Sequence, residues 1–206
     1  MNRSLLMQYL KEEVRQEILQ SAIDEFYQKG YKGASMRNIA QSANMTVGNL
    51  YRYFKNKDEL FDGLVTPVIG AITGLINNHE KHTLFENGNY EELNGFLAKA
   101  LMNIHDNYPK QLYALIHGSK GSNFANFKED FTDQLAEHLQ SHCYLTGGCR
   151  GDVKIEPVIY KVLAQNDVDG YITILESDLP REEKIRAISQ FAELMTSVSF
   201  CNHTLK

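Results

Sequence analysis

Apolar residues recur at every third or fourth position over most of this 206-residue chain, and this spacing is the feature that most constrains its fold. Near the N-terminus, Val14, Ile18, Ala22 and Phe26 follow one another at intervals of four residues. Such a period places apolar side chains on one face of an α-helix. The sequence lacks an alternating apolar run that ends in an Asn-Gly or Asp-Gly turn, which is typical of a β-hairpin. The sequence therefore predicts an all-α fold.

Residues that favour helix ends divide the first sixty positions into four short helices. Gly30 is suited to a left-handed helix end, and Ser35 and Thr46 are residues that cap helix N-termini. Asn56 and Glu59 have the spacing of a capping box. The expected helices are 9–29, 35–43, 46–54 and one that starts at Asn56.

The remainder of the chain has longer apolar stripes and predicts longer helices. Residues 145–154 contain three glycines and form the clearest long loop. The expected helices are 66–82, 90–106, 109–118, 124–144, 155–176 and 181–202.

The bulk composition is that of a cytoplasmic globular protein. No uninterrupted apolar run reaches the roughly 18 residues of a membrane helix, and the short apolar start is broken by charged residues without a signal cleavage site. The three cysteines, Cys143, Cys149 and Cys201, are an odd number at uneven spacing, which does not fit a secreted disulfide framework. We therefore expect no membrane partner.

The distribution of charge favours nucleic-acid binding, although the formal net charge of −5 does not. Residues 26–57 contain six basic residues and no acidic one, whereas an ordinary surface mixes both signs. A local basic patch can meet phosphates while the rest of an acidic protein resists indiscriminate binding.

Within this window, two short helices are joined by three residues, Ala43, Asn44 and Met45. A turn this tight needs one residue with positive φ, and Asn44 is the best choice other than glycine. The next helix offers small or hydrogen-bonding residues at its N-terminal end, and aromatic and basic residues after them. This is the pattern of a helix-turn-helix whose second helix enters the DNA major groove. A simple helical hairpin with a solvated basic face is the alternative.

The segment from Ile18 to Phe61 resembles the DNA-binding domain of the TetR (tetracycline-repressor-like) family. The resemblance is carried in fixed register by Ala22, Phe26, Gly30, Tyr31, Ser35, Ile39, Ala40, Ala43, Gly48, Asn49, Leu50, Tyr51, Tyr53, Phe54, Lys57, Asp58, Glu59 and Leu60. The family usually has glycine at the position of Asn44, and asparagine tolerates the same left-handed turn.

The resemblance implies a DNA-binding domain at 1–62 and a larger helical-bundle domain for effector binding and dimerisation at 63–206. It implies a sequence-specific transcriptional regulator, in the family's usual sense a repressor, that a small-molecule effector releases from operator double-stranded DNA. The implied DNA-binding residues are Ser35, Met36, Arg37, Thr46, Val47, Gly48, Asn49, Tyr51, Arg52, Tyr53, Lys55 and Lys57.

By the same resemblance, the helices near 155–176 and 181–202 form a four-helix bundle with those of a second copy in a homodimer. An effector would bind among the polar-tipped aromatic residues of the preceding helices. The candidates are His105, Tyr108, Tyr113, His117, Phe124 and Phe127.

Two other modes of control stay open. His138, His142, Cys143 and Cys149 have a spacing that could bind zinc or form a redox switch, although incidental surface residues explain them as well. A partner protein could replace the small molecule. Catalytic motifs and phosphate-cradling glycines after a strand are absent from the sequence, so we expect no enzyme, no cofactor and no resident metal.

Overall fold

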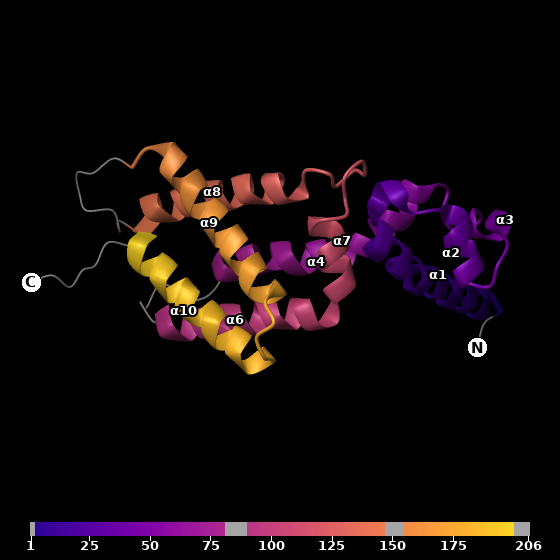
Figure 1. Cartoon of the computed structure of the whole chain (residues 1–206), viewed down its shortest axis with the longest axis horizontal. Coiled ribbons are helices and arrows are strands. Elements are labelled where there is room, and N and C mark those ends of the chain that lie inside the picture. Colours follow the sequence, from indigo (N-terminus) through magenta and orange to yellow (C-terminus); the bar gives the residue numbers. More distant parts are fainter. Residues whose placement is uncertain (1–2, 81–89, 147–154, 200–206) are drawn as a thin grey trace, which may run out of the picture. The chain divides into compact units, whose positions relative to one another are not determined.

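The computed structural model describes the backbone of residues 3–80, 90–146 and 155–199, and these residues form helices with no strand among them (Figure 1). The all-α prediction is confirmed. By their contacts, the residues fall into two compact units, one of Met1–Gly70 with Tyr108–Phe127 and one of Ala71–Asn107 with Lys128–Lys206. The functional boundary expected between residues 62 and 63 stays a prediction.

The helices follow the apolar periodicity closely, and most ends agree with the expected ones within a few residues. Four helices come first: α1 (Arg3–Gly33), α2 (Met36–Ser42), α3 (Val47–Leu50) and α4 (Lys57–Glu80). They are followed by α6 (Tyr90–Asn107), α7 (Pro109–Ile116), α8 (Phe127–Thr146), α9 (Pro157–Glu176) and α10 (Arg181–Ser199). Most of the loop expected at 145–154 lies outside the described residues, and its first two positions belong to α8.

In α4, a single helix replaces the two that we expected at Asn56 and at 66–82. Pro67 lies inside this helix, and the Thr66 hydroxyl donates to the Asp62 carbonyl at 2.6 Å. The expected break was wrong because tertiary packing holds the helix on both sides of the proline. The stretch Lys57–Ile76 is long and apolar enough to cross a membrane, but its first half buries a core stripe of Leu60, Phe61, Leu64, Val65 and Val68.

The core of the first unit forms where α1 crosses α4. Phe26 of α1 meets the Phe61 ring edge-on, with centroids 5.0 Å apart, and both side chains are fully buried. Gly30 interrupts α1 with a φ of +64°, as its sequence position predicts. At this break the Tyr31 N–H donates to the Gly118 carbonyl at 2.7 Å, so the segment after α7 closes the end of α1. The break therefore lets α7 pack on α1.

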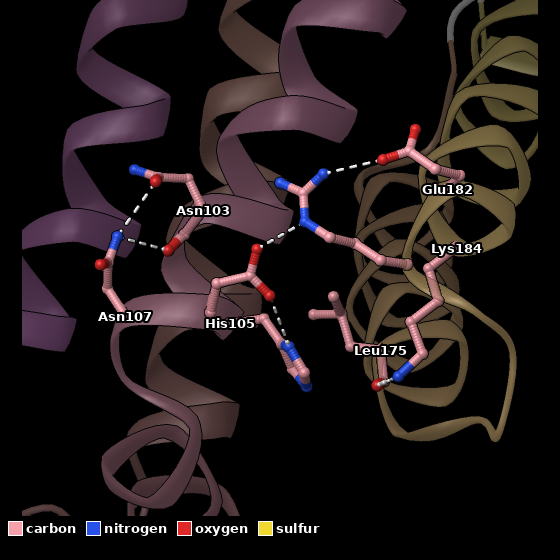
Figure 2. A network of polar contacts seen from close by, with 8 residues as sticks. Asn103, His105, Asn107, Leu175, Glu182 and Lys184 are labelled. Carbon is pink, nitrogen blue, oxygen red and sulfur yellow. Dashed lines mark hydrogen bonds and ion pairs between the residues drawn. The ribbon is translucent and has the colours of Figure 1, made fainter.

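The second unit is a helical bundle in which α10 packs on α6 and α9. Figure 2 shows the polar network at the end of α6, where Arg181 donates to Asp106 at 2.8 Å. Lys184 donates to the carbonyl of Leu175 at 2.6 Å and so satisfies the last turn of α9. These contacts fix the short connection between α9 and α10.

Candidate nucleic-acid interface

The turn between α2 and α3 has the conformation that its sequence predicts. Asn44 is in the left-handed region, with a φ of +52°. The Met45 N–H donates to the Ala40 carbonyl at 2.9 Å, which closes the turn. Thr46 caps α3, because its hydroxyl accepts from the Asn49 N–H at 3.2 Å. The chain therefore enters α3 through a satisfied and sterically allowed turn.

The helix α3 is anchored from one side only. Leu50 and Phe54 are fully buried, while Tyr51 on the other face is 47% exposed. Regular helix ends at Leu50 and the chain continues as a tighter turn to Tyr53, whose N–H donates to the Leu50 carbonyl at 3.0 Å. The expected helix end at residue 53 or 54 was too late, because the buried Phe54 draws the chain back towards the core.

Arg15 of α1 holds the end of this turn. Its guanidinium donates to the Tyr53 carbonyl at 3.0 Å and lies 4.1 Å from the centroid of the Phe54 ring. Arginine combines a hydrogen bond with stacking on an aromatic face more readily than lysine does. We had not singled out Arg15 from the sequence, because the residue lies 38 positions before its partner and carries no local signal.

The start of α2 is held by a carboxylate from α1. Ser35 occupies the N-cap position, but its side chain makes no capping hydrogen bond. Instead, Glu25 accepts from the Ser35 N–H at 3.1 Å and from the Asn38 amide at 3.0 Å. Burial pushes the pKa of Glu25 up, but these bonds and Lys29 outweigh it and lower the pKa. Because the negative charge is stabilised there, Glu25 positions α2 against α1, a role that the sequence alone did not reveal.

The Lys57 ammonium is already engaged within the first unit. It donates to the carbonyls of Tyr31 at 2.7 Å and Ala34 at 3.2 Å, and it lies 4.5 Å from the centroid of the Tyr31 ring. The Tyr31 hydroxyl donates in turn to Asp58 at 2.5 Å. Desolvation and Asp58 raise the pKa of Tyr31 to about 12. An ammonium has three N–H donors, so at most one of those on Lys57 is left for a phosphate.

Most other predicted DNA-binding side chains lie on one helix-turn-helix surface. Exposed positions are Arg37, Thr46, Gly48, Tyr51, Arg52 and Lys55, and half-buried ones are Ser35, Met36, Val47, Asn49, Tyr53 and Lys57. Thr46 and Asn49 spend one polar group each on the cap, namely the hydroxyl oxygen and the backbone N–H. The Asn49 side chain has no such role in that bond.

The predicted effector residues do not form one cluster within a single unit. His105 belongs to the second unit, whereas the other five lie in the 108–127 segment of the first. Tyr113 stacks on Tyr27 of α1 with ring centroids 4.8 Å apart, and His117 lies 4.9 Å from Tyr113. The two best-placed of these residues therefore line the α1–α7 contact.

The cysteines Cys143 and Cys149 and the side chain of His142 lie outside the described residues. Among the residues that are described, no group of three histidine, cysteine or carboxylate side chains is arranged to hold a metal ion. The zinc and redox alternatives thus stay untested hypotheses.

The N-terminal region matches a known family model. Residues 18–64 match that of the bacterial regulatory proteins of the tetR family. The chain is 44% identical over 52 residues to an uncharacterised HTH-type transcriptional regulator, YhgD, of Bacillus subtilis, covering 25% of this chain and 27% of the relative. It is 27% identical over 128 residues to the icaADBC biofilm operon negative regulator IcaR of Staphylococcus epidermidis, covering 62% of each chain.

The fold beyond the DNA-binding region also has a structural counterpart. A TetR-like transcriptional regulator from Rhodococcus sp. RHA1 superposes with a TM-score of 0.64 at 17% sequence identity, over 87% of this chain and 93% of that one. The matches to the two sequence relatives, by contrast, span less than two thirds of their length. By its N-terminal domain and its helical architecture, the chain belongs to the TetR family of bacterial regulatory proteins.

Proposed function

We propose that the protein is a cytoplasmic homodimeric transcriptional regulator, without enzymatic activity, that represses genes by binding operator DNA and is released by a small-molecule effector. The observation that carries this proposal is the exposed face of α3, which is backed by the buried Leu50 and Phe54 and entered through the positive-φ turn at Asn44. Repression is supported by the printed role of the Staphylococcus epidermidis relative as a negative regulator.

The proposed contacts divide by chemistry. Thr46, Val47, Gly48 and Asn49 face the groove floor, where the Asn49 amide can pair with an adenine edge; such a pair discriminates by about 1–3 kcal/mol. Larger polar and basic side chains bind the flanking backbone, which fixes the register of the protein on the duplex. Those are Ser35, Met36 and Arg37 from α2, and Tyr51, Arg52, Tyr53, Lys55 and, through its last free donor, Lys57.

The proposed dimer forms through α9 and α10. Three apolar side chains of α9 stand exposed along one face, with Val158 at 62%, Ile159 at 45% and Val162 at 50% exposure, and α10 adds Leu194 at 64%. Exposed apolar side chains gathered on two neighbouring helices are typical of a protein interface. A two-fold dimer would present two recognition helices to successive major grooves, about 34–36 Å apart.

The proposed effector signal passes through the 108–127 segment. Within the first unit, Lys110 pairs with Asp24 of α1, and Asn123 donates to Asp62 of α4 at 3.1 Å. The same segment is covalently continuous with α6 before it and with α8 after it. An effector that shifts either helix would therefore pull on the supports of the helix-turn-helix. His105, Tyr108, Tyr113, His117, Phe124 and Phe127 stay the proposed residues of this effector response.

The test is fluorescence-anisotropy binding to DNA from upstream of the protein's own gene, at several salt concentrations. We expect sequence-selective binding that weakens steeply with salt, because phosphate contacts release counterions. Tyr51→Ala should weaken it at least tenfold, while Phe96→Ala, which removes an exposed aromatic ring from α6, should not. A folded dimer that binds no DNA at low salt, or a Tyr51→Ala variant that binds like wild type, would contradict the proposal.

A further inference from the structure

A carboxylate lies unpaired inside the second unit. Oδ1 of Asp167, on α9, is buried and makes no hydrogen bond to any described residue. Burial raises the pKa of Asp167 to about 7. Its neighbour Asp169 behaves in the ordinary way, because it pairs with Lys128 at 2.5 Å and accepts from Gln165 at 2.7 Å. Asp167 is thus the acid of α9 whose charge is left without compensation.

The helix places Asp167 on its buried face. Tyr160, seven residues earlier, is 6% exposed, and Ala164, three residues earlier, is fully buried. Positions three, four and seven apart share one side of an α-helix. The exposed stripe of Val158 and Val162 occupies another side of α9. The carboxylate therefore points towards the interior of the bundle and away from the proposed dimer face.

Two aromatic rings stand beside this carboxylate. Tyr171 follows Asp167 by one turn, and its pKa is raised by burial and by the charge of Asp167. The rings of Tyr171 and Phe191 of α10 meet at right angles with centroids 5.1 Å apart. Phe191 lies directly over Gly170, where a side chain would not fit. The site thus combines one anionic group with aromatic surface from two helices.

This combination matches one class of ligand. A buried carboxylate without a partner is costly, and an opposite charge removes most of that cost. Aromatic rings next to a carboxylate recognise alkylammonium and aromatic cations. Magnesium and calcium ions need several oxygen ligands, which one carboxylate does not supply. An anionic ligand would be repelled.

We propose that Asp167, flanked by Tyr171 and Phe191, binds the positive charge of a lipophilic organic cation, and that this cation is the effector class of the protein. The inference rests on the proposed function for the word effector, but not for the binding itself. Ligand binding at Asp167 and DNA binding at α3 can be measured separately.

The test uses isothermal titration calorimetry of the full-length protein with three cations: tetraphenylphosphonium, ethidium and benzyldimethyldodecylammonium. Triphenylphosphine oxide serves as a neutral probe of similar shape. We expect wild type to bind at least one cation and to prefer tetraphenylphosphonium over the neutral probe. Asp167→Asn, which keeps the side-chain shape, should lose about 10–100-fold in cation affinity, the range of a charge-assisted contact. Asp178→Asn, which removes an exposed acid from the same unit, should not.

Operator anisotropy without added cation separates the two proposals. Asp167→Asn should bind DNA like wild type, which also shows that the variant is folded. Loss of DNA binding by wild type itself would overturn the proposed function and leave cation binding to be judged on its own titration. Binding of none of the three cations, equal binding of the neutral probe, or unchanged affinity in Asp167→Asn would overturn the inference. So would a dimer that dissociates on Asp167→Asn, because the partner of the carboxylate would then be the second subunit.

Discussion

At the scale of single residues, the DNA-binding unit depends on backbone positions that few side chains tolerate. Asn44 takes a φ of +52°, and the turn it makes sets the angle between α2 and α3. Left-handed backbone costs most residues roughly 1–2 kcal/mol, whereas glycine and, to a lesser degree, asparagine adopt it readily. The identity of this one residue therefore bears on the presentation of α3.

We predict that Asn44→Ala lowers the free energy of unfolding by about 1 kcal/mol and that Asn44→Gly leaves it nearly unchanged. Urea denaturation followed by circular dichroism measures both. Operator affinity should fall in the alanine variant and persist in the glycine variant. An alanine variant as stable as the glycine variant would show that the turn does not need a left-handed residue.

A second residue-scale prediction concerns Asp167, whose pKa burial raises from 3.8 to about 7. Between these two values the folded protein holds a proton that the unfolded chain has lost, so stability is present at low pH and is lost as the pH rises through about 7. Asp167→Asn removes this dependence. We expect its stability advantage over wild type to grow by a few kcal/mol, in order of magnitude, from pH 4 to pH 8.

Urea midpoints of wild type and Asp167→Asn across that pH range give the measurement. The matched variant is Asp178→Asn, whose difference from wild type should stay constant. Parallel stability curves for Asp167→Asn and wild type would mean that the carboxyl finds a cation or water in solution.

At the scale of elements, each unit is held by a few close contacts between helices. In the first unit these are the Glu25 bonds to α2 and the Arg15 bond to the end of α3. In the second unit, α9 and α10 approach most closely where Phe191 lies over Gly170. A Cβ built on that glycine would come within 2.2 Å of the ring.

We predict that Gly170→Ala lowers the free energy of unfolding by about 1–3 kcal/mol, the usual cost of overpacking. Gly95→Ala in α6 is the control, because nothing lies within 4 Å of its added Cβ. That variant should gain about 0.5–1 kcal/mol from the better helix propensity of alanine. Thermal unfolding of the two variants gives the comparison, and equal melting temperatures would refute the tight α9–α10 contact.

At the scale of the whole molecule, the proposed function requires two copies of the chain. The apolar side chains exposed on α9 and α10 are the surface that we propose for this association. A single recognition helix reads only one half-site, so operator affinity should depend on the dimer. Dimerisation and DNA binding should therefore be lost together.

We predict that the double variant Val158→Lys with Val162→Lys is monomeric at micromolar concentration, because desolvating two ammonium groups in an apolar interface is costly. Its operator affinity should fall at least tenfold, on the order of the 1.4 kcal/mol that a factor of ten represents. Leu179→Lys, an exposed leucine between α9 and α10, is the control. Light scattering after size-exclusion chromatography reports the mass, and a dimeric double variant would place the interface elsewhere.

Local signals in the sequence determined much of the first sixty residues. The positive φ at Gly30 and Asn44, the Thr46 cap and the bond from the Glu59 N–H to Asn56 at 2.7 Å were all predicted. These features depend on residues no more than four positions apart, so short-range steric and hydrogen-bonding preferences decide them. The all-α fold and most helix ends followed likewise from the apolar period.

Tertiary structure alone decided what depends on distant residues. It replaced the Ser35 side chain by Glu25 as the partner of the first turn of α2, and it engaged Lys57 with the carbonyls of Tyr31 and Ala34. It kept α4 continuous through Pro67 and placed Tyr113 on α1. It also left Asp167 unpaired. Each outcome depends on which surfaces meet after the helices pack, and sequence periodicity gives the face of a helix but not the residue opposite it.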